Sequence, residues 1–177
     1  MGTFKVITKP DAEQEYLLNC FRYIVGGHTI PDCYGGINVC PERAYQKMMA
    51  VKQYYGKTTG NQLVHFVITL DHRVFDELDA LLLADRIAGY YGNRYQIIYG
   101  VHRSHRNNRY GLIASYLHIH MIMNSVSFTD GKMYADNKGR YTAISGAYQE
   151  GYRRLSLENC VWTLRWGWYW DFDFASK

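Results

Sequence analysis

The chain has 177 residues, of which 47% are hydrophobic, so it can form one domain with a substantial core. Twenty Lys and Arg against 16 Asp and Glu give a formal net charge of +4, which permits a polyanionic partner without requiring one. This composition argues against a disordered, collagen-like or coiled-coil protein. No apolar run approaches the roughly 20 residues that cross a bilayer, so we expect no membrane insertion.

The cysteines indicate a reducing compartment. The chain has four of them, none in a Cys-x-x-Cys spacing, and its N-terminus lacks the charged head and apolar run of a secretory signal. We therefore expect free thiols and a cytoplasmic protein.

The sequence pattern of the N-terminal half indicates two helices, with one strand before them and one after. Asp11 and Gln14 have the spacing of an N-cap and its partner in the first turn, and Pro41 suits the first turn of the second helix. The apolar face of that second helix consists of Ala44, Met48, Val51 and Tyr55. In chain order we expect a strand at 3–8, a helix at 11–25, a loop at 26–40, a helix at 41–55 and a strand at 63–70.

The C-terminal half predicts a helix, two strands and a further helix. In chain order these are an amphipathic helix at 74–91, strands at 95–102 and 117–128, and a helix at 142–159. On the amphipathic helix we expect Leu78, Leu81 and Leu82 to face inward. The Gly-, Asn- and Arg-rich segment from 103 to 115 is expected to be a long loop between the strands.

These elements predict an α+β fold with a central antiparallel or mixed sheet covered by helices. We expect one domain over residues 1–160, followed by an aromatic tail at 161–177 that contains all four Trp. Three interpretations of the tail stay open: an extra strand, a partner-binding strip, or the end of a truncated reading frame.

The pair His118 and His120 is the most informative motif. Side chains alternate along a strand, so these two imidazoles share one face, while the residues between and around them form a continuous apolar face. A metal site needs a third ligand; His102, at the end of the adjoining strand, is best placed by topology, and His105 is the alternative. Three imidazoles with open positions are typical of a catalytic rather than a structural metal site.

Further motifs surround the histidine strand. Downstream of it lie Asn124-Ser125-Val126-Ser127-Phe128 and Asp130-Gly131-Lys132. The upstream blocks are Gly36-Ile37-Asn38, Pro41-Glu42, the run from Tyr55 to Gln62, His65-Phe66-Val67 and the run from Gly92 to Gln96. In their order these blocks resemble the relaxase, or mobilisation nuclease, domains of the HUH endonuclease superfamily, and the resemblance extends over about residues 4–156.

The resemblance implies a nucleophile, Tyr23, within the run Cys20-Phe21-Arg22-Tyr23-Ile24. Such a tyrosine attacks a phosphate of single-stranded DNA at an origin of transfer and remains joined to the 5′ end as a phosphotyrosine. The resemblance also implies a divalent cation, Mg²⁺ or Mn²⁺, held by His102, His118 and His120. The expected setting is the bacterial cytoplasm, where these domains initiate mobilisation of plasmid or transposon DNA with accessory mobilisation proteins and a coupling protein.

Two stretches without carboxylates add candidate DNA contacts. No Asp or Glu lies between Asp85 and Asp130, and none lies from Arg43 to Leu70. Because phosphate neutralisation supplies much of the affinity for nucleic acid, basic residues there are expected to meet the DNA backbone. The candidate contacts are Lys57, His65, Arg103, Arg106, Arg109 and Asn124, with Tyr110 or Tyr116 as stacking surfaces for bases. For His65 a hydrogen-bonded structural role is the favoured alternative.

Departures from the family's pattern support a second interpretation. The family usually has an Asp two residues after its first histidine, where this chain has Ser104; the stretch from Arg103 to Leu117 includes an insertion; and a Lys-Thr pair after the first helix is replaced by His28-Thr29. The second interpretation is a catalytically impaired relative that only binds DNA or a transfer partner. A replication initiator of the same superfamily is disfavoured, because the tyrosine precedes the histidine pair.

Overall fold

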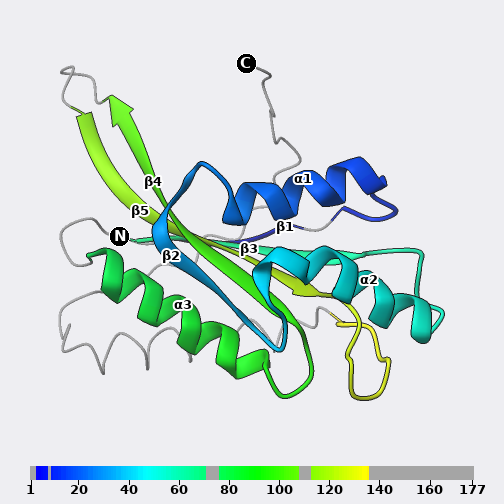
Figure 1. The fold of residues 1–177 in the computed structure, drawn as a ribbon. Helices are drawn as coiled ribbons and strands as arrows, with labels where there is room; N and C mark the ends of the chain where they lie inside the picture. Colours follow the sequence, from blue (N-terminus) through cyan, green and yellow to red (C-terminus); the bar gives the residue numbers. More distant parts are fainter. Residues whose placement is uncertain (1–2, 8, 71–75, 108–112, 136–177) are drawn as a thin grey trace.

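A computed structural model describes residues 3–7, 9–70, 76–107 and 113–135 of the chain (Figure 1). Over these residues it contains five strands, three α-helices and one 3-10 turn. In chain order they are β1 (Thr3–Ile7), α1 (Gln14–Val25), β2 (Thr29–Ile37), η1 (Pro41–Arg43), α2 (Ala44–Tyr54), β3 (Leu63–Thr69), α3 (Glu77–Tyr91), β4 (Ile97–Asn107) and β5 (Ile113–Asn124). The predicted helix at 142–159 and the aromatic tail lie outside the described residues.

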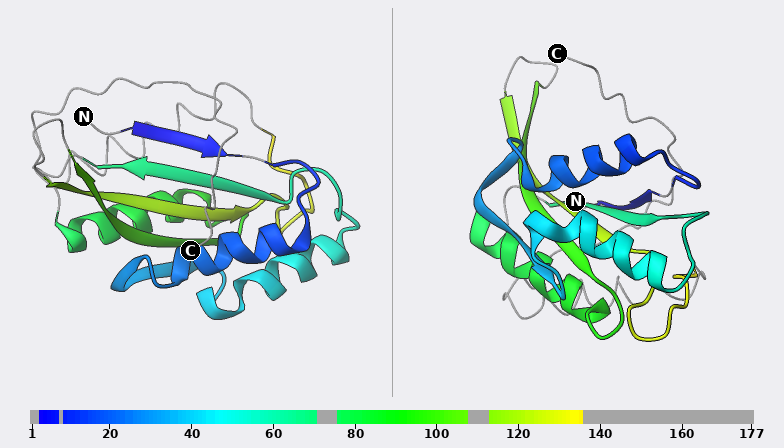
Figure 2. Two further views of the ribbon diagram at one scale, coloured as in Figure 1. Left: turned by 90° about the horizontal axis from the view of Figure 1, so that it is seen from above. Right: turned by 45° about the vertical axis from the view of Figure 1, so that its right-hand side comes forward.

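The strands form one sheet in the order β1-β3-β5-β4-β2, and every neighbouring pair is antiparallel. The predicted α+β class is therefore confirmed, with an antiparallel sheet. The histidine strand β5 lies at the centre, between β3 and β4. Helices α1 and α2 lie side by side over one face of the sheet, and α3 covers the other (Figure 2).

Each face of the sheet has its own hydrophobic cluster, because side chains alternate along β5. Ile119 and Met121 pack in the cluster beneath α3, whereas Ile122 packs beneath α1 and α2. On α1 the residues that face this second cluster recur at helical spacing and are Leu17, Cys20, Phe21 and Ile24. Burying each large apolar side chain contributes about 1.5–3 kcal/mol, so this stripe fixes how α1 lies on the sheet.

Gly100 allows the end of α1 to approach β4 closely. A Cβ atom at this position would lie 2.2 Å from the carbonyl oxygen of Ile24, a distance that no side chain tolerates. Gly100 is paired with His120 on the neighbouring strand. The absence of a side chain at residue 100 thus brings the last turn of α1, which carries Tyr23, directly over the histidines.

Two N-terminal predictions were wrong. Asp11 does not cap α1: it has a φ of 48°, and its Oδ1 accepts the backbone N–H of Gly60 at 2.6 Å, while α1 begins at Gln14. The predicted loop at 26–40 contains the edge strand β2, which pairs with β4 through an irregular register. Pro31 is compatible with this position because the outer side of an edge strand needs no N–H donor.

The inward face of α3 also differs from the prediction. Leu78 and Leu82 are 61% and 43% exposed, and Leu81 is only partly buried. The buried stripe consists of Ala80, Leu83, Ala84, Ile87, Ala88 and Tyr91. Small alanines let the helix approach the sheet, and Asp76 caps its start by accepting the backbone N–H of Asp79 at 2.8 Å.

The predicted loop at 103–115 is largely strand. The β4–β5 ladder continues without a break from Ile97 opposite Met123 to Asn107 opposite Ile113. Residues 108–112 lie outside the described residues. The insertion therefore lengthens a hairpin whose two strands pair with each other, and polar composition alone did not reveal this. Strand β5 ends at Asn124, four residues before the predicted end.

The apolar face of α2 contains an unexpected lysine. Ala44 and Met48 are buried as predicted, but the next buried residue is Lys52, at 1% exposure, rather than Val51. The ammonium donates to Oδ1 of Asn124, and within the described part of the chain no carboxylate forms an ion pair with it. Burial lowers the pKa of Lys52 to about 7.

Replacing Lys52 with methionine should stabilise the protein by about 1–2 kcal/mol at pH 7, because it removes the desolvation cost of a buried amine. The unfolded lysine stays protonated up to its ordinary pKa of 10.5, so wild-type stability rises as the pH increases from 7 towards 10. The advantage of the variant should shrink over that range. Urea unfolding of the variant and the wild type at pH 7 and at about pH 10 measures the difference in stability, and Lys57→Met, at an exposed position, is the control. A loss of stability in Lys52→Met would show that the bond to Asn124 outweighs desolvation.

Candidate active site

Three buried histidines converge on the sheet face beneath α1. His102 on β4 is directly opposite His118 on β5, and His120 follows two residues later on the same face. The ring centroids are 4.6 Å apart for His102 and His120, 4.8 Å for His118 and His120, and 5.5 Å for His102 and His118. One ring nitrogen from each lies within 4.8 Å of the others, so the three could hold a single metal ion.

The hydrogen bonds around His102 leave a bare nitrogen for a cation. Thr29 is paired with His102 across β2 and β4, and its hydroxyl donates to the carbonyl of Ile24 at 2.5 Å. The hydroxyl oxygen, 3.1 Å from His102 Nε2, must therefore accept the Nε2 proton. In a neutral ring this leaves Nδ1 unprotonated, and His102 Nδ1 is buried with no hydrogen-bond partner.

The other two histidines have different surroundings. Nδ1 of His118 is also buried without a partner. His120 Nδ1 lies 2.9 Å from Nε2 of His65 on β3. Buried nitrogens without partners are costly, and a cation would satisfy them. The donor set therefore fits a metal ion held by three imidazoles, of which His102 and His120 are each positioned by an outer hydrogen bond.

Burial keeps all three imidazoles neutral. It lowers the pKa of His102 and of His118 to about 4, and for His102 the charge of His118 lowers it further. Burial is also the main cause that lowers the pKa of His120, followed by the neighbouring His65. Only neutral imidazole has a lone pair for a metal, so the site is ready to bind at neutral pH.

These pKa values predict acid sensitivity of the metal-free protein. Between about pH 6.5 and pH 4 the unfolded chain takes up protons on His102, His118 and His120, whereas the folded chain does not. Stability should therefore fall as the pH drops through that window, by on the order of 1–2 kcal/mol for each of His102 and His118, with His120 adding to the loss. Urea unfolding at pH 7 and pH 5 in excess chelator measures the loss, and His118→Gln should reduce it. Equal stability at both pH values in the wild type would contradict the prediction.

Tyr23 lies against this histidine cluster. Its ring centroid is 4.9 Å from that of His102 and 5.0 Å from that of His120, and His28 contacts it at 5.4 Å. The ring is half-buried in the last turn of α1, and burial raises the pKa of its hydroxyl above 10. A phenol from the first helix and three imidazoles from the centre of the sheet thus share one site.

Comparison with protein families agrees with this arrangement. Residues 23–157 match the model of the family described as "Relaxase: MobA/VirD2-like, nuclease domain". The chain belongs to this relaxase family. The match covers more than half of the chain and includes Tyr23 and all three histidines. Comparison with curated proteins and with solved structures gives no match. Membership implies DNA binding and DNA nicking for mobilisation. None of the helices described for this relaxase is long and apolar enough to cross a membrane.

The structure separates the predicted DNA contacts of the relaxase from one another. Lys57 is exposed in the loop after α2, and Arg103 pairs with Glu77 of α3. Arg103 is opposite Leu117, which packs beneath α3, so it belongs to the sheet face that the three histidines do not share. The backbone of residue 106 is in β4, but its side chain is not described, and residue 109 lies outside the described residues.

Asn124 and His65 are buried rather than available to DNA. The amide of Asn124 is fully used: Oδ1 accepts from Lys52 and from the backbone of Val126, while Nδ2 donates to Met48 and Gln96. His65 contacts His120, in agreement with the structural alternative for this residue. The sequence did not predict that Thr29 is a hydrogen-bond partner of His102, or that His65 contacts His120. A histidine within a buried strand was the available signal, but nothing in the sequence specifies which strands are neighbours.

Proposed function

We propose that this relaxase domain nicks single-stranded DNA at an origin of transfer, with Tyr23 as the nucleophile and a divalent cation held by His102, His118 and His120. The observation that supports this most directly is the contact of the Tyr23 ring with His102 and His120, at 4.9 Å and 5.0 Å. A phosphate that reaches the Tyr23 hydroxyl would also lie close to the three imidazoles.

In the proposed reaction the phenol of Tyr23 gives its proton to solvent, and the phenolic oxygen attacks the scissile phosphorus. The bond from phosphorus to the 3′ oxygen breaks, the DNA 5′ end becomes a phosphotyrosine, and the leaving oxygen takes a proton to give a 3′ hydroxyl. The number of phosphodiester bonds is conserved, so the strand can later be rejoined. A bound divalent cation supplies positive charge that polarises the phosphate and favours the phenolate. Tyr23 needs this help because burial raises its pKa.

The ligand set favours Mn²⁺ over Mg²⁺ as the physiological ion. Within the described residues, the cluster that could hold a metal consists of three histidines and contains no carboxylate. Mg²⁺ prefers oxygen ligands and keeps much of its water shell, whereas sites with nitrogen ligands bind the first-row transition metals, of which Mn²⁺ is the weakest bound. Among the two ions considered, Mn²⁺ accepts nitrogen ligands more readily.

DNA would approach the face that carries Tyr23. We propose Arg106, Arg109 and Lys57 as phosphate contacts. Arg103 lies on the opposite sheet face, where it would contact DNA only after leaving Glu77. Asn124 and His65 would act indirectly, through Lys52 and His120. Accessory mobilisation proteins and a coupling protein in the bacterial cytoplasm complete the proposed setting.

A covalent-adduct assay tests the function. The protein is incubated with Mn²⁺ and labelled single-stranded oligonucleotides that tile the DNA around its own coding sequence, and the products are separated on a denaturing gel. Nicking predicts a labelled protein–DNA band for one oligonucleotide and its loss in excess chelator. Binding that weakens steeply with salt, without an adduct in Mn²⁺ or Mg²⁺, would instead establish the impaired DNA-binding relative.

A further inference from the structure

We infer that His65 is a positioning residue that holds His120 in the tautomer and orientation required by a metal ion. The inference rests on the proposed metal site and assigns a role to a residue outside the three ligands. It starts from one contact: His65 Nε2 lies 2.9 Å from His120 Nδ1, within hydrogen-bond distance.

The sheet places the two rings together. His65 on β3 is opposite Ile122 of β5, and His120 is opposite Val67, so the two histidines are diagonal neighbours on one face. Both are buried, and their ring centroids are 5.2 Å apart. Because β3 is paired on both sides, with β1 and β5, its backbone holds His65 in a fixed position relative to His120.

The contact determines which nitrogen of His120 is free. Nδ1 faces His65, so Nε2 is the atom left for a cation. A metal ligand must be unprotonated, and the single proton of neutral His120 is therefore on Nδ1, from which it is donated to Nε2 of His65. His65 must accept with an unprotonated Nε2, which puts its own proton on Nδ1. One hydrogen bond thus fixes the tautomers of both rings.

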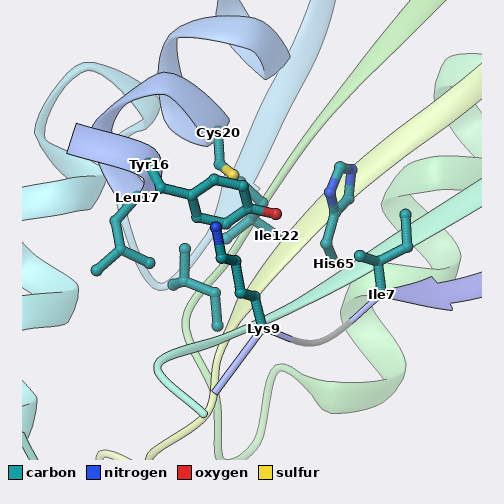
Figure 3. Close-up of a pocket in the computed structure, with 8 residues that line it drawn as sticks. Ile7, Lys9, Tyr16, Leu17, Cys20, His65 and Ile122 are labelled. Carbon is teal, nitrogen blue, oxygen red and sulfur yellow. The ribbon is translucent and has the colours of Figure 1, made fainter. Parts of the chain in front are cut away.

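His120 and His102 form hydrogen bonds with different chemical groups outside the set of three proposed metal ligands. Among the described residues, His102 is held by a hydroxyl, that of Thr29, and only His120 is held by another imidazole. His65 also lines a small pocket with Tyr16 and Cys20 of α1, and the Tyr16 hydroxyl points towards the side on which His65 lies (Figure 3). Residue 65 therefore borders a pocket, and substitutions there test the role.

The test compares Mn²⁺ affinity of the full chain without DNA. His65→Phe keeps a planar ring but cannot accept the proton, whereas His65→Gln can accept it through its amide oxygen. We expect His65→Phe to weaken Mn²⁺ binding by about 10–100-fold, and His65→Gln to recover most of that loss. Val67→Ala is the matched control: Val67 is on β3, as His65 is, and lies opposite His120, but its side chain forms no hydrogen bond. This substitution should change Mn²⁺ affinity by less than about threefold.

A second readout does not depend on the metal. Long-range ¹H–¹⁵N spectra of the metal-free protein should show His120 protonated at Nδ1 in the wild type and in His65→Gln, and a mixture of tautomers in His65→Phe. The inference is overturned by a His120 proton on Nε2, by equal losses of affinity in the Phe and Gln variants, or by normal affinity in His65→Phe. If the wild type binds Mn²⁺ and shows the expected effects of the His65 variants but forms no adduct with DNA, the proposed nicking function is wrong and the role of His65 stands.

Discussion

Replacing Tyr23 with phenylalanine should abolish the covalent adduct with single-stranded DNA, reducing its formation by at least about a thousandfold. The substitution removes one oxygen, the atom proposed to attack the phosphate. It keeps the ring that packs at 4.9 Å from His102 and 5.0 Å from His120. Mn²⁺ affinity and DNA affinity should therefore stay within about twofold of the wild type. Denaturing gels measure the adduct, and fluorescence anisotropy measures DNA binding.

The same helix offers a matched control. Tyr16 precedes Tyr23 by two helical turns, but its ring lies in the pocket beside Cys20 and beneath the ammonium of Lys9, 4.2 Å from the ring centre. Burial raises the pKa of Tyr16 to about 12, with Cys20 contributing. Tyr16→Phe should leave the adduct intact. If the adduct forms in Tyr23→Phe but not in Tyr16→Phe, then the nucleophile is Tyr16 and not Tyr23.

The centre of the site could be predicted because it depends on local rules. Alternation along one strand is sufficient to place His118 and His120 on a common face, and a hairpin between consecutive strands brings His102 opposite His118. Both inferences need only strand periodicity and the sequence order of two neighbouring elements. The antiparallel pairing of β4 with β5 follows from the same hairpin.

The remaining features depend on contacts between distant segments. His65 reaches His120 because β3 is the other neighbour of β5, and the β3–β5 pairing joins strands separated by a helix and another strand. Strand β2 was hidden by proline and glycine, which are compatible with an edge strand. The burial of Lys52 was not predicted, because lysine is rarely buried; among the described residues the amide oxygen of Asn124 accepts its hydrogen bond.

The departures from the family's motifs leave the histidine geometry intact. The insertion extends the hairpin outward from the His102–His118 pair, by the ladder from Arg103 to Asn107, and does not separate the two histidines. Thr29, the retained member of the pair after the first helix, hydrogen-bonds to His102. Where the family usually has an Asp, Ser104 is two residues beyond His102. The imidazoles here are instead positioned by neutral groups, among them Thr29 and His65.

Replacing His120 with alanine should remove metal-dependent cleavage, with a loss of at least about a thousandfold in adduct formation and of Mn²⁺ affinity beyond measurement. His120 contacts the other members of the site. Its ring is within 5.0 Å of those of His102, His118 and Tyr23, and its Nδ1 forms the hydrogen bond with His65 of β3. Calorimetric titration with Mn²⁺ and the adduct gel measure the two losses.

The controls for His120→Ala separate the metal role from a general loss of structure. His120→Asn preserves a polar side chain and should leave the thermal unfolding transition of the chelated protein close to that of wild type, while still failing to bind Mn²⁺. His105→Ala tests the alternative third ligand: its backbone is opposite Ser115, farther out along the hairpin than His102, so cleavage should persist. If His120→Ala still cleaves in a Mn²⁺-dependent manner while His105→Ala does not, then the cation is held elsewhere, and the contact of Tyr23 with His120 has only a packing role.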